Sequence, residues 1–280
     1  MPRRASVLAE AVRLLREAGV ASPDHDAAEL LAHVHAVPRS RLFQIDLVEE
    51  SRREAFEALV ARRAAREPLQ HLTGSAGFRH VDVAVGPGVF VPRPETELLA
   101  GWAVESAGAL EAPVVVDLCT GSGAIARSVA HEVPGARVHA VELDPPAHTW
   151  AERNLAGTGV DLRLGDMATA FGDLQGRVDV VVCNPPYIPL EAWESVAAEA
   201  RDHDPHLALF SGDDGLDAMR VLEERAAFLL KPGGVVGAEH ADVQGASAPE
   251  VFSRAGRWAE VRDHHDLAGR ARFLTARLAR

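Results

Sequence analysis

The stretch that decides the fold of this 280-residue chain is Val114-Val-Val-Asp117-Leu-Cys-Thr-Gly121-Ser-Gly123-Ala-Ile-Ala126. An apolar run typical of a buried strand passes through a glycine turn and continues as a helical pattern. Glycine is needed in such a turn because a Cβ atom would block the approach of a ligand to the backbone and to the positive N-terminus of the helix. The stretch therefore predicts the strand, turn and helix of a parallel βαβ unit.

Strand-like and helical segments alternate along the chain after Pro94. This alternation indicates βαβ units with right-handed crossovers, and hence a doubly wound, Rossmann-like α/β sheet. Near the C-terminus two β-rich runs are joined without a long helix, which indicates an antiparallel pair at the sheet edge. The expected strands are residues 114–118, 137–142, 160–164, 178–183, 235–238, 258–261 and 272–275, and the expected helices are residues 124–133, 146–155 and 216–230.

The N-terminal part has a different pattern. Its first 67 residues show three helical patterns, with apolar residues recurring at intervals of three or four positions. We expect a small helical domain over residues 1–70 and a second domain over residues 71–280, which begins with a β-hairpin connector. In this connector Gly86-Pro87-Gly88 separates two apolar runs of period two, so the hairpin turn is expected at residues 86–88.

The composition is that of a folded globular protein, with 47% hydrophobic and 25% charged residues. The formal net charge of -12 disfavours nucleic acid as the main partner, because a polyanion would be repelled. Cys119 and Cys183 are the only cysteines and lie in apolar runs, so we expect no disulfide and a reducing compartment. The absence of an apolar run of about 18 residues makes the cytoplasm the expected location, without membrane contact. The histidines are spaced like exposed loop residues, so no metal centre is expected.

A nucleoside site is predicted at the glycine turn. Glu142 closes the next strand, 19 residues beyond Gly123, where an acidic side chain can accept hydrogen bonds from two ribose hydroxyls. Asp166 ends the third strand and can accept from the exocyclic amine of an adenine. We therefore expect these two acids, with Thr120, Gly121 and Gly123, to bind the cofactor. Dinucleotide dehydrogenases share this logic, but the third glycine of their motif is missing here.

The tetrapeptide Asn184-Pro185-Pro186-Tyr187 follows a strongly apolar strand, so we expect it beside the glycine turn at the carboxyl edge of the sheet. A planar NH2 group is a poor nucleophile, since its lone pair is delocalised. The Asn184 side-chain oxygen and the Pro185 carbonyl can each accept one N–H and raise the electron density on nitrogen, so no general base is required. The consecutive prolines keep the backbone carbonyls rigid and unpartnered, and the ring of Tyr187 can stack on the substrate.

Further segments of the chain carry a resemblance to a known family: residues 68–74, 91–99, 208–209, 212, 214–217, 239, 244 and 266–270. With the glycine turn and the tetrapeptide, they make nearly the whole chain resemble the PrmC/HemK family of protein-(glutamine-N5) methyltransferases. The resemblance implies a class I methyltransferase fold, S-adenosylmethionine as cofactor, and the glutamine of the Gly-Gly-Gln motif in class I peptide-chain release factors as substrate. It also implies that the N-terminal helices recognise the release factor. The cofactor residues that the resemblance implies are Asp117, Gly121, Glu142, Asp166 and Asn184. The residues that it implies at the glutamine amide are Asn184, Pro185 and Tyr187.

Alternatives to this function stay open on sequence grounds. Asp204-Pro205 stands where the family usually has Glu-Pro, and Met167 replaces a frequent Trp, which indicates a divergent branch. A related branch methylates a glutamine of a ribosomal protein. An adenine-N6 methyltransferase acting on DNA or RNA also suits the tetrapeptide, but the acidic second domain and the lack of a basic cluster with aromatics count against it. A nicotinamide oxidoreductase would give the tetrapeptide no role, and a binding protein would leave the catalytic residues unused.

Overall fold

The computed structural model of the chain describes residues 1–279, which fold into two units. The first unit comprises residues 1–75 together with residues 197–203, and the second comprises residues 76–196 and the chain from Asp204 onward. The helical unit is therefore slightly longer than the expected 1–70. It also includes a short segment from the middle of the second domain, which no local pattern indicates.

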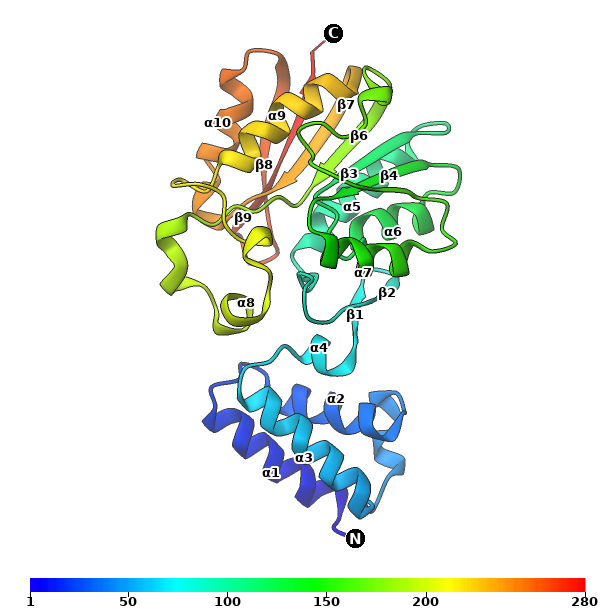
Figure 1. Cartoon of the computed structure of the whole chain (residues 1–280), viewed down its shortest axis with the longest axis vertical. Coiled ribbons are helices and arrows are strands. Elements are labelled where there is room, and N and C mark those ends of the chain that lie inside the picture. The colour runs from blue at the N-terminus through cyan, green and yellow to red at the C-terminus, as the bar shows by residue number, and fades with distance from the viewer. Residues whose placement is uncertain (280) are drawn as a thin grey trace. The chain divides into compact units, whose positions relative to one another are not determined.

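The first unit is a helical bundle (Figure 1), with helices at the three places where the periodicity predicts them. Apolar side chains of the three long helices meet in one core, in which Leu15, Leu30 and Phe56 are buried. Pro23 begins α2, at a position where the N–H that proline lacks would have no intrahelical partner. The helices of this unit are α1 (Arg4–Glu17), α2 (Pro23–His35), η1 (Arg39–Gln44), α3 (Glu50–Ala64), α4 (Leu69–Thr73) and α8 (Ala198–His203).

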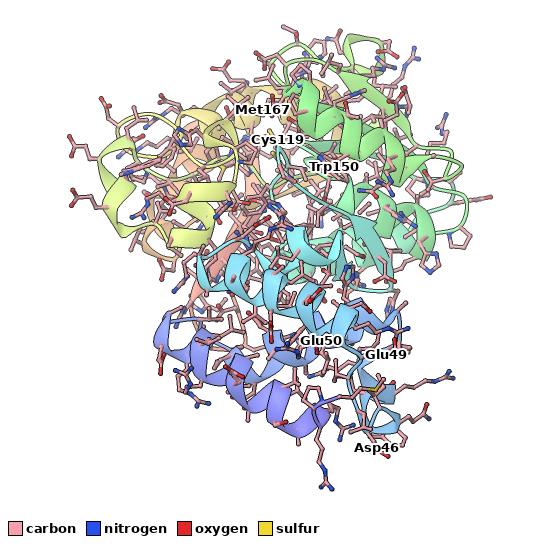
Figure 2. All side chains as sticks on the ribbon, turned by 60° about the horizontal axis from the view of Figure 1, so that its bottom comes forward. Asp46, Glu49, Glu50, Cys119, Trp150 and Met167 are labelled. Carbon is pink, nitrogen blue, oxygen red and sulfur yellow. The ribbon has the colours of Figure 1, made fainter. Side chains whose placement is uncertain are left out.

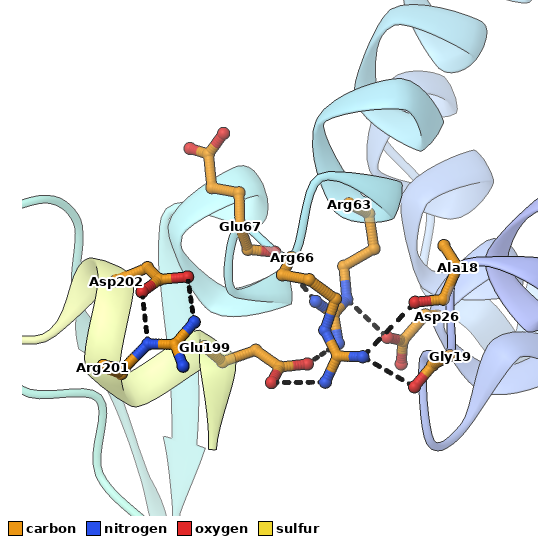
Figure 3. A network of polar contacts seen from close by, with 9 residues as sticks. All are labelled: Ala18, Gly19, Asp26, Arg63, Arg66, Glu67, Glu199, Arg201 and Asp202. Carbon is orange, nitrogen blue, oxygen red and sulfur yellow. Dashed lines mark hydrogen bonds and ion pairs between the residues drawn. The ribbon is translucent and has the colours of Figure 1, made fainter. Parts of the chain in front are cut away.

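A network of ion pairs attaches α8 to the N-terminal helices (Figure 3). The side chain of Arg63 is 8% exposed and donates to Asp26 at 2.8 Å and to Glu199 at 3.1 Å. Arg66 donates to the second oxygen of Glu199 at 2.6 Å. Burial raises the pKa of Glu199, but the hydrogen bonds from Arg66 and Arg63 outweigh this effect and bring the pKa to about 2. A segment 136 positions beyond Arg63 in the sequence thus folds as part of the helical unit.

The second unit is built on a seven-stranded sheet with the order β5-β4-β3-β6-β7-β9-β8 (Figure 1). The first five strands in this order are parallel, whereas β9 is antiparallel to β7 and to β8. This confirms the expected antiparallel pair at the edge. The strands are β3 (Val114–Leu118), β4 (Arg137–Glu142), β5 (Asp161–Leu164), β6 (Val178–Cys183), β7 (Leu230–Glu239), β8 (Trp258–His265) and β9 (Ala271–Leu278).

Helices cover both faces of the sheet, which confirms the doubly wound α/β fold. Successive strand residues point to opposite faces, so Val115 packs in the core with α5, α6 and α7, and Val116 packs in the core with α9 and α10. A strand buried on both faces is largely apolar, and Asp117 is the one polar residue of β3. The helices of this unit are α5 (Thr96–Gly108), α6 (Ala124–Glu132), α7 (Pro145–Leu155), η2 (Gly172–Leu174), η3 (Leu190–Ser195), η4 (His206–Ala208), α9 (Asp217–Leu229), η5 (Asp242–Gln244) and α10 (Ser247–Arg254).

The expected β-hairpin precedes the large sheet, but its turn lies elsewhere. Strands β1 (Ser75–Phe78) and β2 (Val81–Ala84) pair across Arg79-His80. Pro87 and Gly88 do form a turn, but no strand follows at residues 89–91, so the expectation that this turn joins the two strands of the hairpin was wrong. Arg79 adopts a left-handed backbone (φ 50°) and forms two hydrogen bonds to Glu132, at 2.7 and 2.6 Å. The left-handed residue of this turn is therefore an arginine bonded to a distant helix and not a glycine. At the glycine-rich stretch, Trp150 of α7 (Figure 2) donates instead to the carbonyl of Pro87 at 3.2 Å.

Candidate functional site

The site forms where the strand order of the sheet reverses. β3 lies between β4 and β6, so the chain first proceeds from β3 towards one edge and later returns to its other side. The register pairs Leu118 with Cys183, and the next residues along the two strands are Cys119 and Asn184. Loops diverge at such a switch point and leave a crevice in which ligands bind. The glycine turn and the tetrapeptide therefore lie side by side.

A cavity of 410 Å³ occupies this crevice, which is within the size range of ligand pockets. Most of the predicted site residues line it, whereas Asp117, Gly123 and Pro185 do not. The roles assigned to those three residues stay predictions. The predicted residues that line the cavity are Thr120, Gly121, Glu142, Asp166, Asn184, Pro186 and Tyr187.

Asp117 stabilises the glycine turn by hydrogen bonds to the residues on either side of it. This buried carboxylate accepts hydrogen bonds from the Thr120 hydroxyl at 2.5 Å and from the Ala126 backbone N–H at 3.1 Å. Burial raises the pKa of Asp117 to about 7. Gly123 has a left-handed backbone (φ 83°), and a Cβ atom there would lie 3.0 Å from Leu155, so a larger residue would be strained and crowded. Asp117 and Gly123 thus shape the turn.

Two acidic side chains stand at the cavity wall. Glu142 accepts hydrogen bonds from the backbone N–H groups of Gly121, at 2.7 Å, and Asp144, at 2.9 Å, which fix its carboxylate at the end of β4. Burial raises the pKa of Glu142. Asp166 accepts from the backbone N–H of Ala168 at 2.8 Å in the turn after β5. Each carboxylate oxygen can accept more than one hydrogen bond, so both acids retain acceptor capacity for hydroxyl or amine groups of a nucleoside.

Much of the remaining wall is apolar. The Cys119 thiol donates to the Met167 sulfur at 3.5 Å, and both side chains line the cavity (Figure 2). Phe90, Leu207 and Phe210 contribute further apolar surface. Such a wall suits the planar rings and aliphatic parts of a ligand, while the few polar groups fix its orientation.

Asn184 and Tyr187 line the cavity on the tetrapeptide side. The Asn184 Nδ2 group donates to the Thr96 hydroxyl at 3.3 Å. The Tyr187 hydroxyl donates to Glu239 Oε1 at 3.2 Å. Burial and the negative charge of Glu239 raise the pKa of Tyr187, so Tyr187 remains a neutral phenol at physiological pH. It can therefore present its ring and donate a hydrogen bond, but it cannot act as a phenolate base.

Sequence reasoning assigned no site role to Thr96 or Glu239. Thr96 begins α5 and Glu239 ends β7, and both are 4% exposed. Burial raises the pKa of Glu239 to about 7, in spite of the hydrogen bond from Tyr187. The available signal was that both residues lie in segments that carry the family resemblance. Their proximity to the tetrapeptide emerges only from the fold.

Two properties of residues 1–279 concern other classes of ligand. Within this range, no group of three or more His, Cys, Asp and Glu side chains is arranged to hold a metal ion. None of the helices in the same range combines the length and the apolar character that a membrane span requires.

Comparisons with known proteins agree with this geometry. Residues 6–74 match the family model of the PrmC N-terminal domain, and residues 115–203 match a methyltransferase domain model. Over 274 residues the chain is 57% identical to a release factor glutamine methyltransferase of Streptomyces coelicolor. This alignment covers 97% of each of the two chains.

A second relative is named for a different substrate. Over 211 residues the chain is 46% identical to a 4-amino-L-phenylalanine/4-methylamino-L-phenylalanine methyltransferase of Streptomyces pristinaespiralis, which covers 74% of this chain and 72% of that protein. Among solved structures, the hMettl16 catalytic domain in complex with MAT2A 3'UTR hairpin 6 aligns with a TM-score of 0.53 at 15% identity, over 70% of this chain and 75% of that one. This likeness concerns the fold alone, which is that of class I methyltransferases.

Proposed function

The chain belongs to the family of release factor glutamine methyltransferases, and from this premise we propose that it transfers a methyl group from S-adenosylmethionine to the N5 amide nitrogen of a release factor glutamine, the one in the Gly-Gly-Gln motif. The observation that carries the proposal is the identity of 57% over 97% of the chain, which includes the N-terminal helices. The cavity beside Asn184 supplies the chemical reason.

The cavity residues fit S-adenosylmethionine. Glu142 presents a fixed carboxylate suited to the ribose diol, and Asp166 an acceptor suited to the adenine amine. Gly121 lies in the turn and leaves the backbone accessible, and the apolar wall near Met167 suits the flat adenine ring. When bound, S-adenosylmethionine supplies an electrophilic methyl group on a sulfonium.

The tetrapeptide activates the amide nitrogen. The side-chain oxygen of Asn184 and the backbone carbonyl of Pro185 each accept one N–H of the glutamine amide, which orients the nitrogen and raises its electron density. The two prolines hold the backbone carbonyls rigid before the substrate arrives, so little backbone reorganisation is needed in the transition state. Tyr187 packs its neutral ring against the planar amide.

The first unit recognises the protein substrate in this proposal. Its helices match the PrmC N-terminal domain model, and the ion pairs of Arg63 and Arg66 with Glu199 attach residues 197–203 to them. The chain on either side of this segment contributes Ile188 and Pro205 to the cavity wall. The helical unit is therefore linked covalently to the stretch of chain that follows the tetrapeptide. Since release factors act during translation, the cytoplasm is the location that this function implies.

A second candidate substrate is an aromatic amine, because the chain is 46% identical to a methyltransferase of 4-amino-L-phenylalanine. The amine of such a substrate is planar and delocalised, so the two acceptors of the tetrapeptide suit it as well. That match covers 74% of the chain, against 97% for the release factor enzyme, and the fuller coverage favours a protein substrate.

A comparison of candidate substrates tests the proposal. The purified enzyme is incubated with labelled S-adenosylmethionine and, in parallel, with release factors, ribosomal proteins, tRNA and free 4-amino-L-phenylalanine, and kcat/KM is measured for each. The highest kcat/KM is expected for a release factor. A preference for the free amino acid would establish the second candidate, and label on adenine would reveal a nucleic-acid enzyme.

A further inference from the structure

Thr96 and Glu239 form a second layer behind the tetrapeptide. The register of the sheet pairs Cys183 of β6 with Ala238 of β7, so Asn184 and Glu239 follow at the same edge on neighbouring parallel strands. Glu239 does not line the cavity, whereas Thr96 and Asn184 do. A buried carboxylate is costly unless it is hydrogen-bonded, so its presence next to two substrate-binding residues calls for a function.

The hydrogen bonds in this layer have a fixed direction. The Tyr187 hydroxyl donates to Glu239 Oε1 at 3.2 Å, which orients the ring of Tyr187. The Asn184 Nδ2 group donates to the Thr96 hydroxyl at 3.3 Å, which orients the side-chain amide of Asn184.

This direction decides which end of the Asn184 amide faces the substrate. With Nδ2 held by Thr96, the side-chain oxygen is the end that remains for the substrate N–H. If the amide were turned over, an NH2 group would face the NH2 group of the substrate, and one of the two acceptors would be lost. We propose that Glu239 and Thr96 are positioning residues that orient the Asn184 amide and the Tyr187 ring for methyl transfer to a planar nitrogen.

The proposal rests on the proposed function, because it concerns the same nitrogen acceptor site. It also gives the protonation of Glu239 a consequence. The ionised carboxylate of Glu239 accepts the hydrogen bond from Tyr187 more strongly than the neutral acid does, because the bond is then charge-assisted. Arg272 on β9 lowers the pKa of Glu239, Glu95 before α5 raises it, and burial, the largest effect, leaves it at about 7. Since the ionised form is the competent one, kcat should rise with pH and level off above about 7.

Variants of Thr96 separate this role from simple packing. Thr96→Val keeps the shape of the side chain and removes the hydroxyl, whereas Thr96→Ser keeps the hydroxyl. We expect Thr96→Val to lower kcat on the release factor roughly ten- to hundredfold with little change in the affinity for S-adenosylmethionine, and Thr96→Ser to stay close to wild type. Ser128→Ala is the matched control, because Ser128 is a fully buried hydroxyl of α6 outside the cavity wall. Equal activity of the Val and Ser variants would overturn the proposal.

A double-mutant cycle tests whether Thr96 acts through Asn184. In an Asn184→Ala background, Thr96→Val should cause little further loss of kcat, because no amide remains to be oriented. Independent, multiplicative losses would mean that Thr96 has only a structural role. This outcome is distinct from failure of the proposed function, in which the wild-type enzyme itself would not methylate release factors.

Glu239→Gln provides a second, independent measurement. Glutamine keeps the size of the side chain but replaces one acceptor by a donor, so kcat should fall and its rise across about pH 7 should disappear. If Glu239→Gln keeps the rise of kcat across about pH 7, another group is responsible for the rise, and the role proposed for the ionised Glu239 is contradicted. If this variant does not fold, as judged by thermal unfolding, the Thr96 pair and the double-mutant cycle decide the question.

Discussion

Replacement of Asn184 by alanine separates catalysis from cofactor binding most clearly. In the proposed function Asn184 supplies one of two oxygen acceptors for the substrate N–H groups, and Pro185, which the mutation does not change, supplies the other from the backbone. Loss of one preorganised hydrogen-bonding group at a centre of developing charge costs about 2.7–4 kcal/mol, or a factor of roughly 10² to 10³ in kcat. We expect a loss of that size in Asn184→Ala.

The same replacement should leave the fold intact. Asn184 is only partly buried, and its hydrogen bond to Thr96 is long, at 3.3 Å. The net contribution of such a bond to stability is about 1 kcal/mol, which is small against the stability of a whole domain. The acids proposed to bind the nucleoside are Glu142, at the end of β4, and Asp166, just after β5. Neither is adjacent to Asn184 in the sequence, so the affinity for S-adenosylmethionine should be nearly unchanged.

The assay measures methyl transfer to purified release factor at saturating substrate, with calorimetry for the affinity of S-adenosylmethionine. Wild-type kcat in Asn184→Ala would refute the acceptor role of this side chain. A loss of cofactor affinity that accounts for the loss of activity would show instead that Asn184 belongs to the nucleoside site.

Three further predictions follow from other contacts. Glu142→Ala should weaken the affinity for S-adenosylmethionine roughly tenfold to a hundredfold, because a charge-assisted contact worth about 1.5–3 kcal/mol is lost; unchanged calorimetric affinity would count against the ribose assignment. Deletion of residues 1–67 should abolish release factor methylation but preserve cofactor binding, and full methylation by the truncated chain would exclude substrate recognition by the helices. The pKa of Asp117 is raised above its ordinary value of 3.8 to about 7, so the folded state binds the proton more tightly and the free energy of unfolding should fall as pH rises from about 4 to about 7. Denaturant titrations should show that Asp117→Asn removes this decline, and an unchanged pH dependence in the variant would contradict it.

The central strands were predictable because they are buried on both faces. The bounds expected for β3, β4 and β6 coincide with those in the structure. β3 and β6 are fully buried runs that end before the glycine turn and the tetrapeptide, and β4, which is partly exposed at its start, ends at Glu142. The order of these segments in the chain, with the switch-point rule, was then enough to place Glu142 and Asn184 at one cavity. Local pattern and global fold agree at these positions.

Features that depend on distant partners were not predictable. The hairpin turn was expected at a glycine-rich stretch, but it lies at Arg79, whose side chain is bonded to Glu132, 53 positions away. The membership of α8 in the helical unit depends on Arg63 and Arg66, which meet Glu199 only in the folded chain. Thr96 is likewise 88 positions from Asn184, so no spacing rule connects the two residues.

Localisation of the transferred methyl group tests the central claim most directly. The purified enzyme is incubated with S-adenosylmethionine and an intact release factor, and the product is digested and analysed by fragmentation mass spectrometry. We predict a single methyl group on the side-chain amide of the glutamine in the Gly-Gly-Gln motif. A methyl group on any other residue, or an unmodified release factor under conditions in which a different substrate is methylated, would contradict the account.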